Sequence, residues 1–199
     1  PSCELHPVQA TLTNVIGVEN TITSAVNHGI ESIVVLSTDK AVAPVNAMGI
    51  TKALMEKVAL SKVLTNRCLK TRIMVTRYGN VIGSRGSVIP RFLNQIKSNS
   101  PLTVTNPHMT RFMMTLDDAV QLVVHAMVSG RSGDLLVQKA PSASVNDIVA
   151  SLQRCLSINL EVKNIGIRLG EKLHESILSN EELLRSKEEN NYFRVSLTD

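Results

Sequence analysis

The sequence predicts an α/β fold, a doubly wound parallel sheet with helices between its strands. Segments with apolar residues at helical spacing alternate with short apolar strands, and the connections between them are short. The strands ESIVVLS and TRIMVTRY are apolar over most of their length, as is typical of strands buried in a parallel sheet. Hydrophobic residues make up 43% of the chain and charged residues 19%, which is ordinary for a globular protein.

The expected elements follow from local patterns. Gly29 ends the first long helical pattern, and Pro44 lies in the turn before the next helix. A Gly- and Ser-rich loop occupies residues 79–90. The charged tail over 181–193 is expected to be exposed. In chain order, the patterns predict helix 8–28, strand 31–37, helix 47–64, strand 71–78, helix 91–99, an extended stretch 101–115 interrupted at Pro107, helix 116–130, strand 133–140, helix 144–156 and strand 160–167.

The composition argues against several classes of protein. The formal net charge is +4, but aromatic residues are only 3%, there is no Trp and the basic residues are scattered, so nucleic-acid binding is not expected. No apolar run approaches the roughly 18 residues that a membrane span needs. The opening PSCELHP resembles neither a basic leader nor a signal peptide. We therefore expect a cytoplasmic protein without a membrane span.

The cysteines and histidines give no metal-site pattern. Cys3, Cys68 and Cys155 are odd in number and lack metal-ligand spacing, so they are interpreted as reduced thiols. The 5 histidines show no HxxxH or carboxylate pairing, and no metal is assigned.

A glycine-rich phosphate loop of the GxGxxG type is absent from the sequence. A doubly wound sheet should also contain more strands than the patterns predict. The chain is therefore expected to be the C-terminal part of a larger enzyme, with the N-terminal nucleotide-binding half absent.

The end of the first predicted strand carries reactive side chains. Thr38, Asp39 and Lys40 follow the apolar segment directly, and ligands of open α/β sheets bind beyond the carboxyl ends of strands. Asp39 and Lys40 can act as an acid and base pair if they lie close together. On spacing alone, a surface turn with an incidental ion pair is an equally good interpretation.

Several segments resemble one known family. They are LSTDKAVAPVNAMGITKALMEK, TRYGNVIGSRGSVIP, MTRFMMTLDDAV, GDLLVQKAP and GIRLGEKLHE, in order and at plausible spacing over nearly the whole chain. Together they are similar to the extended short-chain dehydrogenase/reductases. More narrowly, they resemble the CapD/CapE-like polysaccharide biosynthesis proteins, inverting UDP-N-acetylglucosamine 4,6-dehydratases. The resemblance implies a Rossmann-type fold, bound NAD (NADP stays open) and a UDP-sugar substrate.

The resemblance also assigns roles at the strand end. Thr38 would hydrogen-bond the 4-oxygen of the sugar, Asp39 would protonate the departing 6-hydroxyl, and Lys40 would take the proton from carbon-5. Lys52 matches the lysine of the YxxxK motif, which holds the nicotinamide ribose. Met48 stands where that motif has its tyrosine, and a thioether has no proton to exchange. Lys40 is our candidate for the group that starts the oxidation in its place.

Further residues are assigned by the same resemblance, with ordinary surface or turn roles as alternatives. Asn14 and Tyr78 would lie near the cofactor. The residues expected to bind the sugar nucleotide are Asn80, Arg85, Ser87, Arg111, Arg168 and Glu171.

The resemblance implies a division into domains. Residues 1–80 would complete the NAD-binding domain and residues 81–199 would mainly bind the sugar nucleotide, with segments near 115–155 returning to the first domain. The helices at 8–28 and 47–64 match those that pair in a dimer, so a homo-oligomer is expected.

The expected function is the dehydratase, because epimerisation would not need the Asp39–Lys40 pair. The alternatives are a UDP-glucose or UDP-N-acetylglucosamine 4-epimerase and an inactive truncated fragment.

Overall fold

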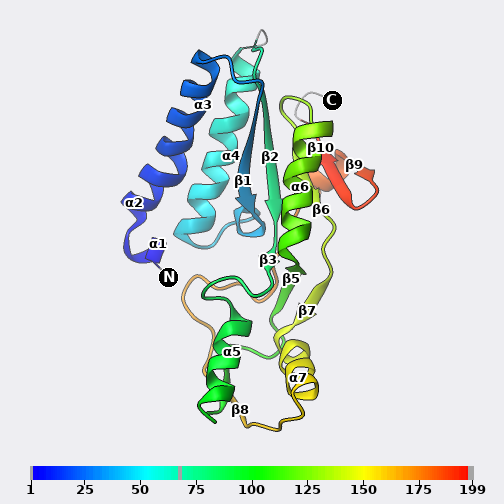
Figure 1. Cartoon of the computed structure of the whole chain (residues 1–199). Helices are drawn as coiled ribbons and strands as arrows, with labels where there is room; N and C mark the ends of the chain where they lie inside the picture. The colour runs from blue at the N-terminus through cyan, green and yellow to red at the C-terminus, as the bar shows by residue number, and fades with distance from the viewer. Residues whose placement is uncertain (1, 67–68, 197–199) are drawn as a thin grey trace. The chain divides into compact units, whose positions relative to one another are not determined.

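The structure is a computed structural model that describes residues 2–66 and 69–196, so Cys68 lies outside the described residues. The chain forms two compact units (Figure 1). Unit 1 comprises Pro1–Tyr78, Asp117–Lys139 and Ser176–Asp199. Unit 2 comprises Gly79–Leu116 and Ala140–Glu175.

Unit 1 is built on a five-stranded sheet in the order β1-β2-β6-β10-β9. The strands β1 (Ser32–Thr38), β2 (Arg72–Tyr78) and β6 (Leu135–Gln138) are parallel, and β1 pairs with β2 over its whole length. β10 (Tyr192–Val195) and β9 (Ser186–Glu189) extend the sheet with antiparallel pairing. The predicted α/β fold with a parallel sheet is therefore confirmed.

Helices cover both faces of this sheet, as the alternation of its side chains requires. Val35 and Val137 pack with Ile22 and Met55 from the helices on one face, while Val34 and Leu136 belong to a cluster with α6 on the other. The helical segments of unit 1 are α1 (Ser2–Leu5), α2 (Pro7–Thr11), the π-helical η1 (Leu12–Ile16), α3 (Gly17–Asn27), the 3-10 turn η2 (Asp39–Ala41), α4 (Ala47–Thr65), α6 (Leu116–Ser129) and α8 (Asn180–Leu184).

Unit 2 has small sheets around its own core. Phe92, Leu102 and Ile148 are among the side chains buried there. β3, β5 and β7 form one sheet, and β4 pairs with β8 in another. Its elements are β3 (Asn80–Val81), α5 (Val88–Lys97), β4 (Leu102–Val104), β5 (Thr110–Met114), β7 (Ser142–Ser144), α7 (Val145–Cys155) and β8 (Val162–Asn164).

The tail differs from the sequence prediction. The stretch 181–193, expected to be charged and exposed, contains no buried residue, but it forms most of α8, all of β9 and the start of β10, and the two strands join the main sheet. Val195 is buried in the core of unit 1. The segments that return to unit 1 are 117–139 and 176–199, whereas 140–155, predicted to return with 115–155, belongs to unit 2. The tail joins the sheet because β10 pairs with β6 in antiparallel orientation. This contact is long-range in sequence, so local composition does not predict it.

The burial of Val195 gives a test of the tail. Val195→Ala should lower the free energy of unfolding by about 1–3 kcal/mol, because it removes buried methyl groups and leaves a cavity. Leu184→Ala is the control, because that side chain is 87% exposed and its loss should change stability by no more than about 0.5 kcal/mol. Urea unfolding measures both. Equal midpoints for the two variants would contradict the packing of β10.

A close backbone contact joins the start of α4 to the turn η2. Asn46 caps the helix, since its side chain accepts a hydrogen bond from the Gly49 amide at 2.8 Å. A Cβ added at Gly49 would lie 2.3 Å from the carbonyl oxygen of Lys40. Only glycine lets the helix approach the turn this closely.

Gly49→Ala should therefore destabilise the protein by about 1–3 kcal/mol through overpacking against backbone. Gly17→Ala is a matched control in another helix, where the added Cβ would lie 3.5 Å from the Leu12 carbonyl oxygen, an ordinary van der Waals contact. There the higher helix propensity of alanine should give a gain of roughly 0.5–1 kcal/mol. Thermal and urea unfolding compare the two. If Gly49→Ala leaves the free energy of unfolding unchanged, the turn η2 can move away from the added methyl group at little cost.

Candidate active site

The carboxyl end of β1 forms a hydrogen-bonded chain of three side chains. Thr38 ends the strand, and the backbone turns at once into η2. The Thr38 hydroxyl donates to Asp39 Oδ1 at 2.8 Å, and Lys40 Nζ donates to the same oxygen at 2.9 Å. The structure thus brings these three predicted residues together.

Burial distinguishes Asp39 from its neighbours. Asp39 is 0% exposed, and the side chain of Lys40 is 23% exposed. The second carboxylate oxygen, Asp39 Oδ2, is buried without a hydrogen-bond partner. A buried oxygen of this kind needs a donor or a proton, since an unsatisfied polar atom is costly. The incidental surface ion pair considered above does not describe a carboxylate this deeply buried.

Lys52 lies on α4 and reaches back to the same strand. Its Nζ donates to the carbonyl of Leu36 at 3.0 Å. Burial lowers the pKa of Lys52, against the Coulombic effect of Glu56, which raises it. Met48 lies one turn earlier on α4, and its carbonyl accepts a hydrogen bond from the Thr51 hydroxyl at 3.0 Å.

Asn14 lies in the π-helical turn η1, which interrupts the first long helix. Its Nδ2 donates to Thr51 Oγ1 at 3.0 Å, so it contacts α4 next to Lys52. π-Turns inside helices cost stability and occur frequently at functional sites. The continuous helix predicted over 8–28 is therefore wrong in this detail, and the distortion falls at a predicted site residue.

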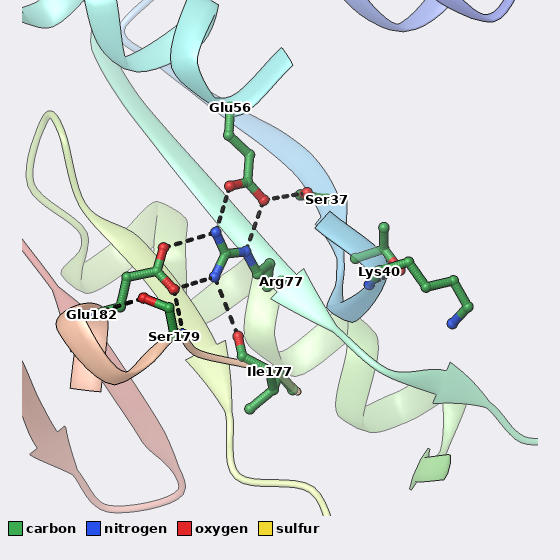
Figure 2. A network of polar contacts seen from close by, with 8 residues as sticks. Ser37, Lys40, Glu56, Arg77, Ile177, Ser179 and Glu182 are labelled. Atoms are coloured by element: carbon green, nitrogen blue, oxygen red, sulfur yellow. Dashed lines mark hydrogen bonds and ion pairs between the residues drawn. The ribbon is translucent and has the colours of Figure 1, made fainter. Parts of the chain in front are cut away.

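A buried network of charges lies beside the strand end (Figure 2). Arg77 on β2 donates through Nε and Nη2 to Glu56 on α4, at 2.8 and 2.6 Å. It donates through Nη1 and Nη2 to Glu182 on α8, at 2.7 and 2.9 Å. The Ser37 hydroxyl donates to Glu56 Oε1 at 2.5 Å. Sequence reasoning missed this network.

The charged forms of Arg77 and Glu182 in this network are stabilised by their hydrogen-bond partners. Burial alone would lower the pKa of Arg77, but hydrogen bonds to Glu56 and Glu182 raise it above its ordinary value. Burial would raise the pKa of Glu182, but hydrogen bonds from Arg77 and the Ser179 amide lower it. A signal was present in the sequence: Arg77 lies in a largely apolar strand, and Glu56 follows one helical turn after Lys52.

Tyr78 ends β2 in register with Thr38. It packs against the cluster of Leu122, Ala126 and Leu136, on the face of the sheet that α6 covers. The structure therefore gives Tyr78 a packing role, and its contact with a cofactor stays a prediction.

The predicted substrate residues lie in unit 2. Asn80 is in β3 and Ser87 precedes α5. Asn80 Oδ1 and Ser87 Oγ are both buried without a hydrogen-bond partner. Buried polar atoms normally have a hydrogen-bond partner, so both atoms have bonding capacity to spare, and their contact with a substrate stays a prediction.

The predicted charged residues of unit 2 have different surroundings. Arg111 on β5 donates to the carbonyls of Thr110 and Leu173, at 2.7 and 3.4 Å. Arg85 is exposed in the turn before α5. Arg168 is exposed, and its amide donates to Glu171 Oε2 at 3.2 Å within one turn. Their roles toward a substrate stay predictions.

Within residues 2–66 and 69–196, no group of three or more His, Cys, Asp or Glu side chains could hold a metal ion. In the same residues, no helix combines the length and apolar character that a membrane crossing demands. Cys3 and Cys155 are free thiols.

Comparison with curated proteins gives relatives of one kind. The chain is 47% identical over 197 residues to a protein of Rickettsia felis named UDP-glucose 4-epimerase. The match covers 99% of this chain and 58% of that protein. A Rickettsia conorii protein of the same name matches to the same extent. The chain thus spans less than two thirds of these relatives.

Solved structures are similar over most of the chain. The crystal structure of Pen from Bacillus thuringiensis has a TM-score of 0.91 and 36% identity, over 98% of this chain and 61% of that one. DesIV from Streptomyces venezuelae, a dTDP-glucose 4,6-dehydratase crystallised with NAD and TYD, has a TM-score of 0.80. Its identity is 20%, over 90% of this chain and 61% of that one, so this likeness concerns the fold.

The family model described as "Polysaccharide biosynthesis protein" matches residues 1–197. The resemblance seen in the sequence segments is thereby confirmed at the level of the family, while the dehydratase activity is not decided by it. The chain belongs to the polysaccharide biosynthesis protein family.

Proposed function

We propose that the complete protein containing this chain is an NAD-dependent enzyme that oxidises carbon-4 of a UDP-sugar and later reduces the keto sugar, in polysaccharide biosynthesis. The observation that carries this proposal is the chain of Thr38, Asp39 and Lys40 through one carboxylate oxygen. A hydroxyl, a carboxylate and an amine in contact can pass a proton from the 4-hydroxyl. These three residues thereby provide the proton transfer that the thioether of Met48 cannot perform.

Residues of unit 1 are suited to hold the cofactor. Lys52 would bind the nicotinamide ribose, and Asn14 contacts the same helix through Thr51. NAD supplies the acceptor and donor of the hydride when bound. NADP is the alternative, since the choice depends on a nucleotide-binding half that this sequence does not contain.

Epimerisation is the first outcome that we propose. The Rickettsia relatives named UDP-glucose 4-epimerase support it, at 47% identity. Epimerisation needs only the carbon-4 step, with hydride returned to the other face of a keto sugar that has turned in the site. Thr38 would hold the 4-oxygen, and Lys40 would take and return its proton.

A second candidate is the inverting 4,6-dehydration of UDP-N-acetylglucosamine. The contact between Asp39 and Lys40 favours it, because elimination needs both an acid and a base. Lys40 would remove the carbon-5 proton, which the adjacent ketone acidifies, and Asp39 would protonate the departing 6-hydroxyl. Water leaves, hydride is returned to carbon-6, and carbon-5 is reprotonated.

We also propose that the complete protein is a cytoplasmic homo-oligomer. Apolar side chains are exposed on the two segments that were expected to pair, among them Val8, Leu12 and Ile16 before α3 and Ile50 and Leu54 on α4.

NMR in deuterated water distinguishes the proposed outcomes. The complete protein is incubated with NAD and, separately, with UDP-glucose and UDP-N-acetylglucosamine. Epimerisation should give the galacto isomer without deuterium in the sugar ring. Dehydration should give a carbon-6 methyl group and deuterium at carbon-5. Absence of both products would overturn the proposed function.

Asp39→Asn tests the hydrogen-bonded chain. It should lower kcat by about 100-fold or more, because loss of a positioned proton-transfer group costs 10²–10⁴-fold. Asp117→Asn, an exposed aspartate on α6, should leave kcat unchanged. Steady-state kinetics on the complete protein measures both. If Asp39→Asn keeps more than about half of the activity, Asp39 has no part in the proton transfer.

A further inference from the structure

The guanidinium of Arg77 lies at two of the points where the chain passes between the units. Arg77 immediately precedes Tyr78, the residue at which the first segment of unit 1 ends. The last segment of unit 1 begins at Ser176, and the Ile177 carbonyl accepts from Arg77 Nη1 at 3.3 Å. The chain therefore leaves for unit 2, and finally returns from it, beside the same side chain (Figure 2).

Every N–H of this guanidinium can be assigned a partner. Arginine has five such donors. Nε and one Nη2 hydrogen point to the two oxygens of Glu56, the other Nη2 hydrogen and one Nη1 hydrogen to those of Glu182, and the last to Ile177. Two bidentate pairs on one planar group fix orientation as well as distance.

Glu182 is itself held in place by its helix. It forms a capping box with Ser179, whose amide donates to Glu182 Oε2 at 2.8 Å and whose hydroxyl accepts from the Glu182 amide at 3.2 Å. The stretch from Ile177 to Glu182 is thereby anchored to β2 through Arg77.

Glu56, the second carboxylate bound to Arg77, connects the network to the candidate active site. Glu56 lies one helical turn after Lys52 and accepts from Ser37, the residue before Thr38. Lys52 Nζ donates to the Leu36 carbonyl at 3.0 Å and contacts Met55 Sδ at 3.6 Å. Arg77 thus ties the ends of β1 and α4 to the stretch that returns from unit 2.

We propose that Arg77 and Glu182 are positioning residues, which set the two connections to unit 2 against the strand and helix that carry Thr38, Asp39, Lys40 and Lys52. The inference rests on the proposed function, because the four positioned residues are those proposed to act on the UDP-sugar and to hold the cofactor. Loosening the Arg77–Glu182 pair should weaken the use of the sugar nucleotide and leave cofactor binding intact.

Glu182→Gln in the complete protein is the test, since it keeps the shape of the side chain and removes its charge. KM for the UDP-sugar should rise between about fivefold and a hundredfold, because small displacements from productive geometry are costly. NAD affinity should stay within about twofold of the original. Glu181→Gln is the matched control at the adjacent exposed position, and its constants should not change.

Hydrogen exchange gives a readout that does not need turnover. Amides near residues 79–81 and 176–178 should exchange faster in Glu182→Gln than in Glu181→Gln. If the original protein turns over no UDP-sugar, the proposed function fails, and the exchange rates still decide whether the pair fixes both connections. Unchanged exchange there would overturn the inference.

Kinetics separates positioning from stability alone. A lower melting temperature with unchanged KM and kcat would show a purely structural pair and overturn the proposal. Equal changes in Glu181→Gln would do the same by indicating a general charge effect. If Glu182→Gln does not fold, Ser179→Ala weakens only the capping box that holds Glu182, and the same rise in KM is expected.

Discussion

One guanidinium and two carboxylates share the interior of unit 1, and the elements that carry them have to meet there. Burying charges costs several kcal/mol per ion, which is offset only when every donor and acceptor is satisfied. Arg77 meets this condition with Glu56, Glu182 and the Ile177 carbonyl. Removing Arg77 would leave both carboxylates without their counter-charge, so this one guanidinium ties β2, α4 and α8 together.

The candidate active site depends on the same constraint. Ser37 donates to Glu56 and is followed in the chain by Thr38, while Lys52 lies one turn before Glu56 on α4. The backbone positions of Thr38 and Lys52 are therefore restricted by the hydrogen bond between their neighbours Ser37 and Glu56. The close contact of Gly49 with the Lys40 carbonyl adds a steric limit from the other end of the turn. Charge pairing and packing thus define one position for the strand end.

Local sequence patterns were enough to predict the features that depend on neighbouring residues alone. Apolar strands alternating with helices gave the sheet, and the polar residues at a strand end gave Thr38, Asp39 and Lys40. The tail was missed because SKEE and YFRV become strands only when they pair with each other and with β6. The Arg77–Glu182 pair joins residues 105 positions apart, a separation that no spacing rule covers. The π-turn at Asn14 likewise has no sequence pattern of its own.

The replacement of the usual tyrosine by Met48 is consistent with how the strand end is built. A tyrosine would act as a separate proton donor, whereas here Thr38 and Lys40 meet on one oxygen of Asp39, and the other oxygen of Asp39 is buried and unpaired. Such a group can serve the 4-oxygen alone, which is enough for epimerisation, or extend its acid and base chemistry to carbon-5 and carbon-6. In our proposal both candidate reactions use Thr38 and Lys40 at carbon-4, and dehydration would add the acid role of Asp39.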